Sequence, residues 1–339
     1  MRRGPVRSGP ALALFVDPRT LGTVTQYAIR RVLLMFPTLL FVALVTFVLA
    51  QAAPGSPFER NPDKPLPPAV VENLTRRYGL DRPVHEQFAL YVWNAARFDF
   101  GDSIIRRRPV SDIIGDGLPK TAQLGIQALV VALAVAIPLG IVSALRQNTM
   151  IDYASVFFAT IGTTIPSFVL GLFAIYIFGV ALGWIPFVGW GAGCGPLPSC
   201  DVKRMILPTI LLAAGPAAFL TRLTRASVLE AVRQDFIRTA RGKGLSERAV
   251  ILVHALRNAL IPIVTIIGPV TAGLLVGSFF IEYIFNIPGS GREYIRAINS
   301  RDYPVIMATT LLYAFFIVIA NLLVDLTYGI LDPRIKVGK

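Results

Sequence analysis

Charged side chains are scarce in this sequence. Asp, Glu, Lys and Arg make up 16% of the 339 residues, and hydrophobic residues make up 54%, whereas a typical soluble domain carries about 25% charged and 45–50% apolar residues. Six apolar segments have no charged residue in their interiors, and they cover residues 32–52, 121–145, 154–180, 205–220, 259–281 and 304–323. Because about 20 apolar residues cross a bilayer as a helix, we expect an all-α polytopic membrane protein with six transmembrane helices.

Cysteine and histidine are also rare. The chain has only Cys194, Cys200, His85 and His254, which are too scattered for a Cys/His metal cluster. The nearest approach to a phosphate-binding loop, at residues 242–244, lacks the required spacing and hydroxyl. No Ser/His/Asp or Cys/His set stands in a recognisable context. We therefore expect no metal site, no directly bound cofactor and no enzymatic activity.

The first apolar segment has two interpretations. Arg30 and Arg31, the apolar run, and then Ala50-Gln51-Ala52 resemble a secretory signal with a small-residue cleavage site. The apolar run of about 20 residues exceeds the 7–15 that are usual for a signal peptide, and a long basic tail precedes it. We expect a retained first transmembrane helix.

The net charge of +13 bears on topology. The apolar composition argues against nucleic acid as a partner, so the positions of Lys and Arg are read by the positive-inside rule. Excess Lys and Arg occur in the tail at 1–31, the loop at 222–258 and the tail at 331–339, whereas acids and bases balance one for one in 54–118. We expect both tails and the loop on the cytoplasmic side of the plasma (inner) membrane, and residues 53–118 outside.

The outer segment is expected to be helical. Pro67-Pro68 precede one short helix, and Asp81 is expected to cap a second helix with Pro83 in its first turn. The side chains that share a face of this second helix at helical spacing are Val84, Phe88, Tyr91 and Val92. Packing against the outer ends of the spans and a partner surface both fit this face.

The spans give two indications about mechanism. Ion-coupled carriers commonly place ionisable residues inside the membrane, and the absence of such residues suggests another energy source. Small polar residues surround Pro166 in the third span, which is expected to be kinked there. Thr163, Thr164 and Ser167 are candidates to line a pathway, although small residues are also common at plain helix contacts.

The basic stretch at 235–260 has the pattern of a helix, a turn and a second helix. Gly242 and Gly244 interrupt the first helix, which is expected to continue from the fourth span, and Ser246 is expected to cap the second helix at Glu247. The apolar side of the second helix is expected to comprise Ala249, Leu252, Val253 and Leu256. A rigid protein-docking element and an interfacial helix on anionic lipid both fit this pattern.

This loop resembles the EAA loop of ATP-binding-cassette (ABC) importer permeases. Ala240, Gly244 and Leu256 match the family pattern, whereas Arg238 stands in place of its acid and Arg257 in place of its proline. The variant is similar to the B-type subunits of dipeptide and oligopeptide importers. The resemblance extends to further stretches across nearly the whole chain, including YGLDRP at 78–83, FDFGDSI at 98–104, RPVSDII at 108–114, SRDYPV at 300–305 and NLLVDLTYGILDPRI at 321–335.

The resemblance implies a type I importer fold, with a five-helix permease core at 119–330 that includes the coupling loop. It also implies a C-type permease partner, two cytoplasmic ATPase subunits that hold ATP-Mg, and an extracytoplasmic substrate-binding protein. The implied ATPase-coupling residues are Arg238, Thr239, Ala240, Gly242, Gly244, Leu245, Ser246 and Glu247. The cargo stays open between peptides and nickel or another small solute, because the same branch includes such systems.

The two cysteines lie in the outer loop GWGAGCGPLPSCD, which is rich in Gly and Pro. No other cysteine competes for either of them, and an oxidising compartment favours a bond. We expect a disulfide between Cys194 and Cys200, with two free thiols as the alternative because the sequence does not set the distance between their Cα atoms.

Overall fold

The computed structural model describes residues 18–53, 67–77, 79, 81–185, 189–190 and 202–331. Within these ranges the protein is helical, with one isolated β-bridge between Asp102 and Pro109 and no strand. The elements in chain order are α1 (Pro18–Ala52), α2 (Pro68–Arg77), α3 (Val84–Ala95), α4 (Val110–Leu145), α5 (Met150–Thr164), α6 (Ser167–Ala174), the π-helical η1 (Ile175–Ala181), α7 (Val202–Val232), α8 (Asp235–Gly242), α9 (Glu247–Ala249), the π-helical η2 (Val250–Ala255), α10 (Leu256–Ala259), α11 (Ile261–Ile284), α12 (Ser290–Ser300) and α13 (Tyr303–Leu331).

Five of these helices, α1, α4, α7, α11 and α13, are long and apolar enough to cross a membrane. The segment at 150–181 consists of two helical halves that meet at an angle of 101°. It supplies a sixth span if these two halves are counted as one broken span. Ile165 is extended there (φ −88°, ψ 124°), because the ring of Pro166 disfavours a helical conformation in the residue before it. The expected all-α polytopic fold is confirmed, and the expected kink at Pro166 is a sharp break.

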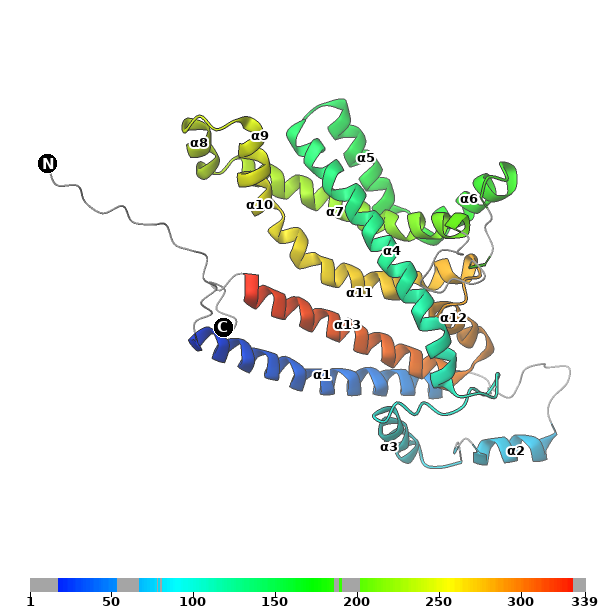
Figure 1. Ribbon diagram of the computed structural model, residues 1–339. Helices are drawn as coiled ribbons and strands as arrows, with labels where there is room; N and C mark the ends of the chain where they lie inside the picture. Colours follow the sequence, from blue (N-terminus) through cyan, green and yellow to red (C-terminus); the bar gives the residue numbers. More distant parts are fainter. Residues whose placement is uncertain are drawn as a thin grey trace.

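The helices form an elongated bundle whose two ends differ (Figure 1). The short helices α8, α9 and α10 gather at one end, and α2, α3, α6 and α12 gather at the other. α1 lies along α13 and meets α3 near its outer end, and most of its described apolar side chains are exposed, as at Leu33, Phe36 and Phe41. This outer face of α1 suits a lipid environment.

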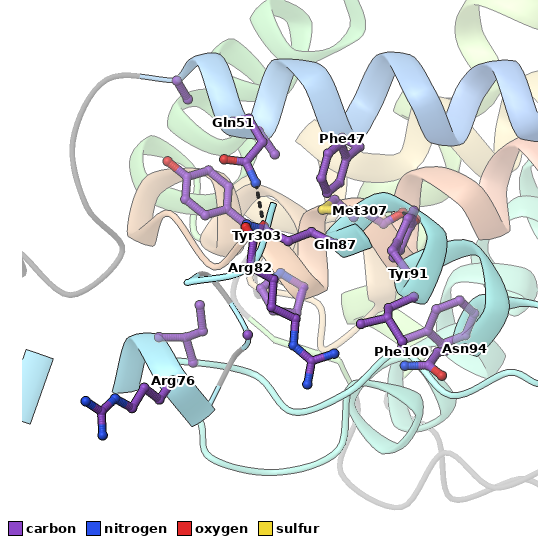
Figure 2. Close-up of a pocket in the computed structure, with 16 residues that line it drawn as sticks. Phe47, Gln51, Arg76, Arg82, Gln87, Tyr91, Asn94, Phe100, Tyr303 and Met307 are labelled. Atoms are coloured by element: carbon purple, nitrogen blue, oxygen red, sulfur yellow. Dashed lines mark hydrogen bonds between the residues drawn. The ribbon is translucent and has the colours of Figure 1, made fainter. Parts of the chain in front are cut away.

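The outer helix α3 packs against the ends of α1 and α13 (Figure 2). The rings of Phe88 and Tyr91 lie 5.4 and 6.5 Å from the ring of Phe47 on α1, and the Tyr91 hydroxyl donates to the Met307 carbonyl at 3.3 Å. Two of the four expected face residues, Phe88 and Tyr91, therefore meet the spans, but Val84 is 58% exposed. The expected N-cap was wrong, because Pro83 occupies that position and no side chain caps α3.

A cavity of about 580 Å³ lies under α3. Phe47, Gln51, Gln87, Tyr91 and Met307 are among its lining residues, and the Gln51 amide donates to Gln87 at 2.8 Å (Figure 2). No local pattern in the sequence indicates this cavity, because it arises where three elements that are distant in the chain meet.

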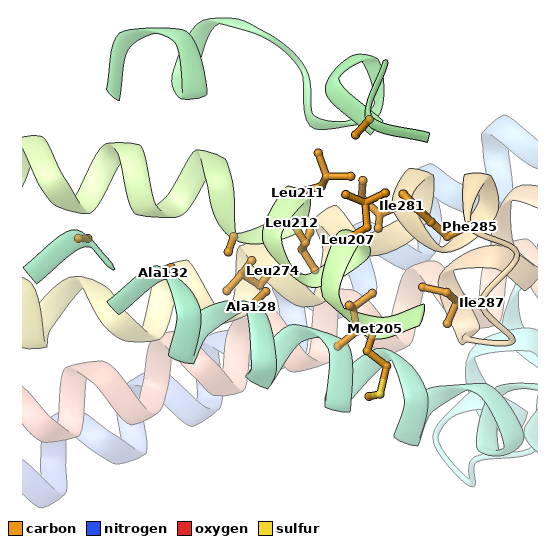
Figure 3. Packing of buried hydrophobic residues seen from close by; sticks show 14 of the residues in the cluster. Ala128, Ala132, Met205, Leu207, Leu211, Leu212, Leu274, Ile281, Phe285 and Ile287 are labelled. Carbon is orange, nitrogen blue, oxygen red and sulfur yellow. The ribbon is translucent and has the colours of Figure 1, made fainter. Parts of the chain in front are cut away.

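The main core lies between α4, α7 and α11 (Figure 3). Ala128, Ala132 and Ala136 are fully buried at a spacing of four residues along α4, so they form one small-residue face. α7 and α11 fill the facing side with larger residues such as Leu211, Leu274 and Ile281. Small residues on one helix let the backbone of its neighbour approach closely, which is how membrane helices gain dispersion contacts.

Candidate functional site

The element at 235–259 begins with α8 and turns sharply at Gly244. The Gly244 N–H donates to the Arg241 carbonyl at 2.9 Å, and the Leu245 N–H donates to the Ala240 carbonyl at 3.4 Å. This pair of bonds is the Schellman motif, which ends a helix with a residue in the left-handed region. Gly244 has φ +78°, so the position that the sequence singles out needs a residue that tolerates a positive φ.

The second half of the element starts where the sequence predicted. The Ser246 hydroxyl accepts from the Ala249 N–H at 3.4 Å and caps the helix that begins at Glu247. The Arg241 guanidinium donates to both carboxylate oxygens of Glu247, at 3.1 and 2.6 Å. This charge-assisted pair joins the two halves across the turn, and it holds the pKa of the Glu247 carboxyl below its usual range.

A small apolar core holds α8 against the following helix. It consists of the buried side chains Ile237, Ala240, Val250 and Ala255, with Val232 packed on it. The prediction for the second helix was partly wrong, since Leu252 and Val253 are 64% and 57% exposed. The reason is the π-helical stretch η2, whose wider turn shifts every following side chain around the axis.

The first half also differs from the prediction. A single helix was expected to continue from the fourth span to Ala240, but α7 ends at Val232 and α8 begins at Asp235. The break lets α8 turn back, so that Ile237 and Ala240 pack on Val250 and Ala255. The expected coupling residues Arg238, Thr239, Gly242, Gly244, Leu245, Ser246 and Glu247 are all exposed, and only Ala240 is buried.

The element is fixed to the spans by a second apolar cluster. Ala144 of α4, Val228 and Ala231 of α7, and Ala259 of α10 are buried together. The element therefore rests on the ends of α4 and α7 and does not extend freely from them.

A groove of about 470 Å³ lies at the break between α5 and α6. Thr163 and Ser167 line it, together with residues of α7 and α11 such as Gly215, Pro216 and Gly273. Among the residues that the structure describes, no charged side chain lines this groove. Thr164, the third candidate, does not line this groove. The Thr163 hydroxyl donates to the carbonyls of Ala159 and Thr160 at 3.1 and 3.0 Å, so it satisfies its own helix.

Two further predictions concern cysteine and metal. Cys194 and Cys200 lie outside the described residues. Within the described part of the chain, no group of three or more His, Cys, Asp or Glu side chains could hold a metal ion.

The comparisons with known proteins decide the family. The family model for the binding-protein-dependent transport system inner membrane component matches residues 136–337, and a model for the N-terminal part of such components matches residues 24–125. The chain belongs to this family. The resemblance to ABC importer permeases is thus confirmed, and this inner membrane component is a transport subunit and not an enzyme.

Curated relatives match this inner membrane component over nearly its whole length. The dipeptide transport system permease protein DppB of Bacillus subtilis is 44% identical, over 93% of this chain and 99% of that protein. The oligopeptide transport system permease protein AppB of the same organism is 40% identical, over 92% and 100%. The glutathione transport system permease protein GsiC of Shigella flexneri is 39% identical, over 92% and 99%.

Proposed function

We propose that this chain is the B-type permease subunit of an ATP-driven peptide importer. With a C-type permease partner it encloses a pathway for dipeptides or oligopeptides, which a substrate-binding protein delivers from outside. The observation that carries this proposal is the end-to-end similarity, at 39–44% identity, to relatives named for dipeptide, oligopeptide and glutathione transport. The groove at Pro166 is this subunit's contribution to the pathway. Its uncharged lining suits a peptide that is recognised by the peptide's own backbone and not by charged side chains.

The element at 235–259 is the docking site for one of two cytoplasmic ATPase subunits, which bind ATP-Mg. Three features support this role: the Schellman turn at Gly244, the Arg241–Glu247 pair and the small buried core. Together they make a rigid projection, which a lipid-surface helix does not need. The exposed Leu252 and Val253 offer apolar contacts to a partner.

The orientation follows from the excess of Lys and Arg. Both tails and residues 222–258 lie in the cytoplasm, and residues 53–118 lie outside. In this orientation α3 and α12 face the binding protein. The element at 235–259, called the coupling element from here on, faces the ATPases.

Ligand identification tests the cargo. The complex is purified with its binding protein, and the ligand released from that binding protein is identified by mass spectrometry. We expect a dipeptide or oligopeptide. Nickel or another small solute in place of a peptide would reject the peptide assignment and leave the importer assignment standing.

A further inference from the structure

A partly buried ion pair joins the start of α5 to α7. The Arg225 guanidinium donates to both oxygens of the Asp152 carboxylate, at 2.6 and 2.8 Å, and the Asp152 side chain is 3% exposed. The Ser143 hydroxyl and the Asn148 N–H also donate to this carboxylate, at 2.6 and 3.0 Å. One carboxylate thus receives donors from α4, from the turn after α4 and from α7.

The pair lies between the coupling element and the groove. Arg225 lies about two helical turns before the end of α7. In this last part of α7, Val228 and Ala231 are buried against Ala259 of the coupling element. Asp152 stands in the first turn of α5, whose other end supplies Gly162 and Thr163 to the groove.

Close helix contacts lie on α7 next to Arg225 and earlier in that helix. A Cβ on Gly140 of α4 would lie 2.6 Å from the Thr224 Cβ, and a Cβ on Gly162 of α5 would lie 3.0 Å from the Ala218 Cβ. α4 and α5 are therefore both in direct contact with α7, α4 at Thr224 next to Arg225 and α5 at Ala218, about two helical turns earlier. These contacts resist separation of the helices, but smooth apolar surfaces do not stop one helix from sliding along another.

The chemistry of the pair supplies what the apolar contacts lack. A buried ion pair is a weak source of net stability, because the cost of removing two charges from water offsets their attraction. A bidentate guanidinium–carboxylate contact does fix both the separation and the relative angle of its two helices. The pair is suited to holding α5 and α7 in one register.

We propose that Asp152 and Arg225 are positioning residues for transport, which make the coupling element, α7 and α5 move as one body. Displacement of the coupling element then reaches the groove through this pair. The inference rests on the proposed function, since it assumes that ATPase subunits act on the coupling element.

Asp152→Asn tests the pair with little change in shape, since the amide oxygen can still accept from the Asn148 N–H and the amide NH2 can donate to the Ser143 hydroxyl, while the charge and the two-point contact with Arg225 are lost. The complex is reconstituted in vesicles, and peptide uptake and ATP hydrolysis are measured together. We expect ATPase association and hydrolysis to persist, while uptake per ATP hydrolysed falls roughly tenfold, within the usual range of coupling between sites. Glu72→Gln on α2 is the matched control, because its pair with Arg76 is exposed. Unchanged uptake per ATP in Asp152→Asn contradicts the proposal.

A distance measurement tests the same pair without reference to cargo. Spin labels are placed at Arg257 on α10 and Phe157 on α5, whose side chains are both exposed. In the wild-type complex we expect one narrow distance distribution that is the same with and without ATP. In Asp152→Asn we expect a distribution that broadens or shifts when ATP binds. Equally narrow and constant distributions in both proteins would show that the pair only stabilises the fold.

A wrong cargo and a wrong role for the pair give different results. If the wild-type complex takes up no peptide, the proposed cargo is wrong, while the label distances still test the pair. If Asp152→Asn does not accumulate, Arg225→Lys is measured in the same two ways, since lysine keeps the charge but cannot make the two-point contact. Wild-type coupling and wild-type distances in Arg225→Lys then overturn the proposal.

Discussion

Gly244 shows how one residue type is set by backbone geometry. Its φ of +78° closes the Schellman turn after α8, and a Cβ built at this position would meet nothing within 4 Å. The cost of a substitution therefore comes from the backbone and not from a clash. The sequence predicted the turn itself, because two glycines in a helical pattern indicate a turn. It did not predict the Arg241–Glu247 or Asp152–Arg225 pairs, whose partners are set by how the helices fold back.

At Gly244 we predict that the residue's tolerance of the left-handed region decides the phenotype. Gly244→Val should lose ATPase association or ligand-stimulated hydrolysis while membrane insertion persists, because a left-handed L-residue costs about 1–2 kcal/mol and a β-branched one more. Gly244→Asn should be mild, since Asn tolerates this region. Co-purification and an ATPase assay measure both.

Two substitutions control this test. Gly115→Ala on α4 has open space around its Cβ and no positive φ, and Glu72→Gln on α2 changes an exposed side chain; both lie outside the element at 235–259. Both should keep normal coupling. If Gly244→Val also couples normally, the assignment of this element as the coupling site is wrong.

The disulfide remains a prediction at the residue scale. We expect Cys194 and Cys200 to be bonded, and closing so short a loop stabilises the fold by roughly 2 kcal/mol in the chain-entropy model. Intact-mass analysis after alkylation without reductant measures this directly. Two alkylated cysteines would rule the bond out.

At the scale of the element, the sequence predicted the membrane-spanning helices well, because each of them contains a long apolar run. The expected spans match α1, α4, α7, α11 and α13, although the helices extend further at several ends. The break between α7 and α8 was missed, because Arg233-Gln234 carries no Gly or Pro to mark it. The π-helical turn η2 was missed as well, since a period of 3.6 residues assumes a regular helix. In both places the burial of Ile237 and Val250 decides the structure, and that contact is not visible in a local pattern.

The coupling element should depend on its small core. Ile237 is fully buried, and Ile237→Ala should destabilise the packing of α8 by about 2–5 kcal/mol, so we expect weak ATPase association. Leu252→Ala removes an exposed side chain of similar size and should leave α8 protected. Hydrogen–deuterium exchange of α8 distinguishes the two, and equal protection in both variants contradicts the packing described here.

The contact between α4 and α7 gives a test within one helix. Gly140→Ala places a Cβ 2.6 Å from the Thr224 Cβ and 2.8 Å from the Thr221 carbonyl oxygen, and such overpacking costs about 1–3 kcal/mol. Gly115→Ala lies in the same helix with nothing within 4 Å. Thermal unfolding of the purified complex should show a lower midpoint for Gly140→Ala only. Identical midpoints would mean that the two helices are further apart than described.

At the scale of the whole molecule, composition and charge predicted a polytopic helical protein, and the family match confirmed it. The relative placement of α3, α1 and α13 around the outer cavity was not predictable, since it depends on long-range contacts such as Tyr91 with Met307. The two ends of the bundle have different tasks in this account. In the proposed orientation, the end with α8 to α10 would meet the ATPases, and the end with α3 and α12 would meet the binding protein.

The proposed orientation can be tested with two single cysteines in a background without Cys194 and Cys200. His85 on α3 and Arg248 in the coupling element are both exposed. We expect His85→Cys to react with an impermeant maleimide added outside intact cells, and Arg248→Cys to react only after the membrane is opened. Labelling of both from outside would contradict the orientation.

The central claim is that this subunit forms part of an ATP-driven pathway for peptides. The most direct measurement is the uptake of a labelled dipeptide or oligopeptide into proteoliposomes that hold both permease subunits and both ATPases, with the binding protein added outside and ATP inside. We predict accumulation that requires both ATP and the binding protein, and that disappears in Gly244→Val. ATP hydrolysis without accumulation of any peptide supplied, or accumulation of nickel in its place, would contradict the account.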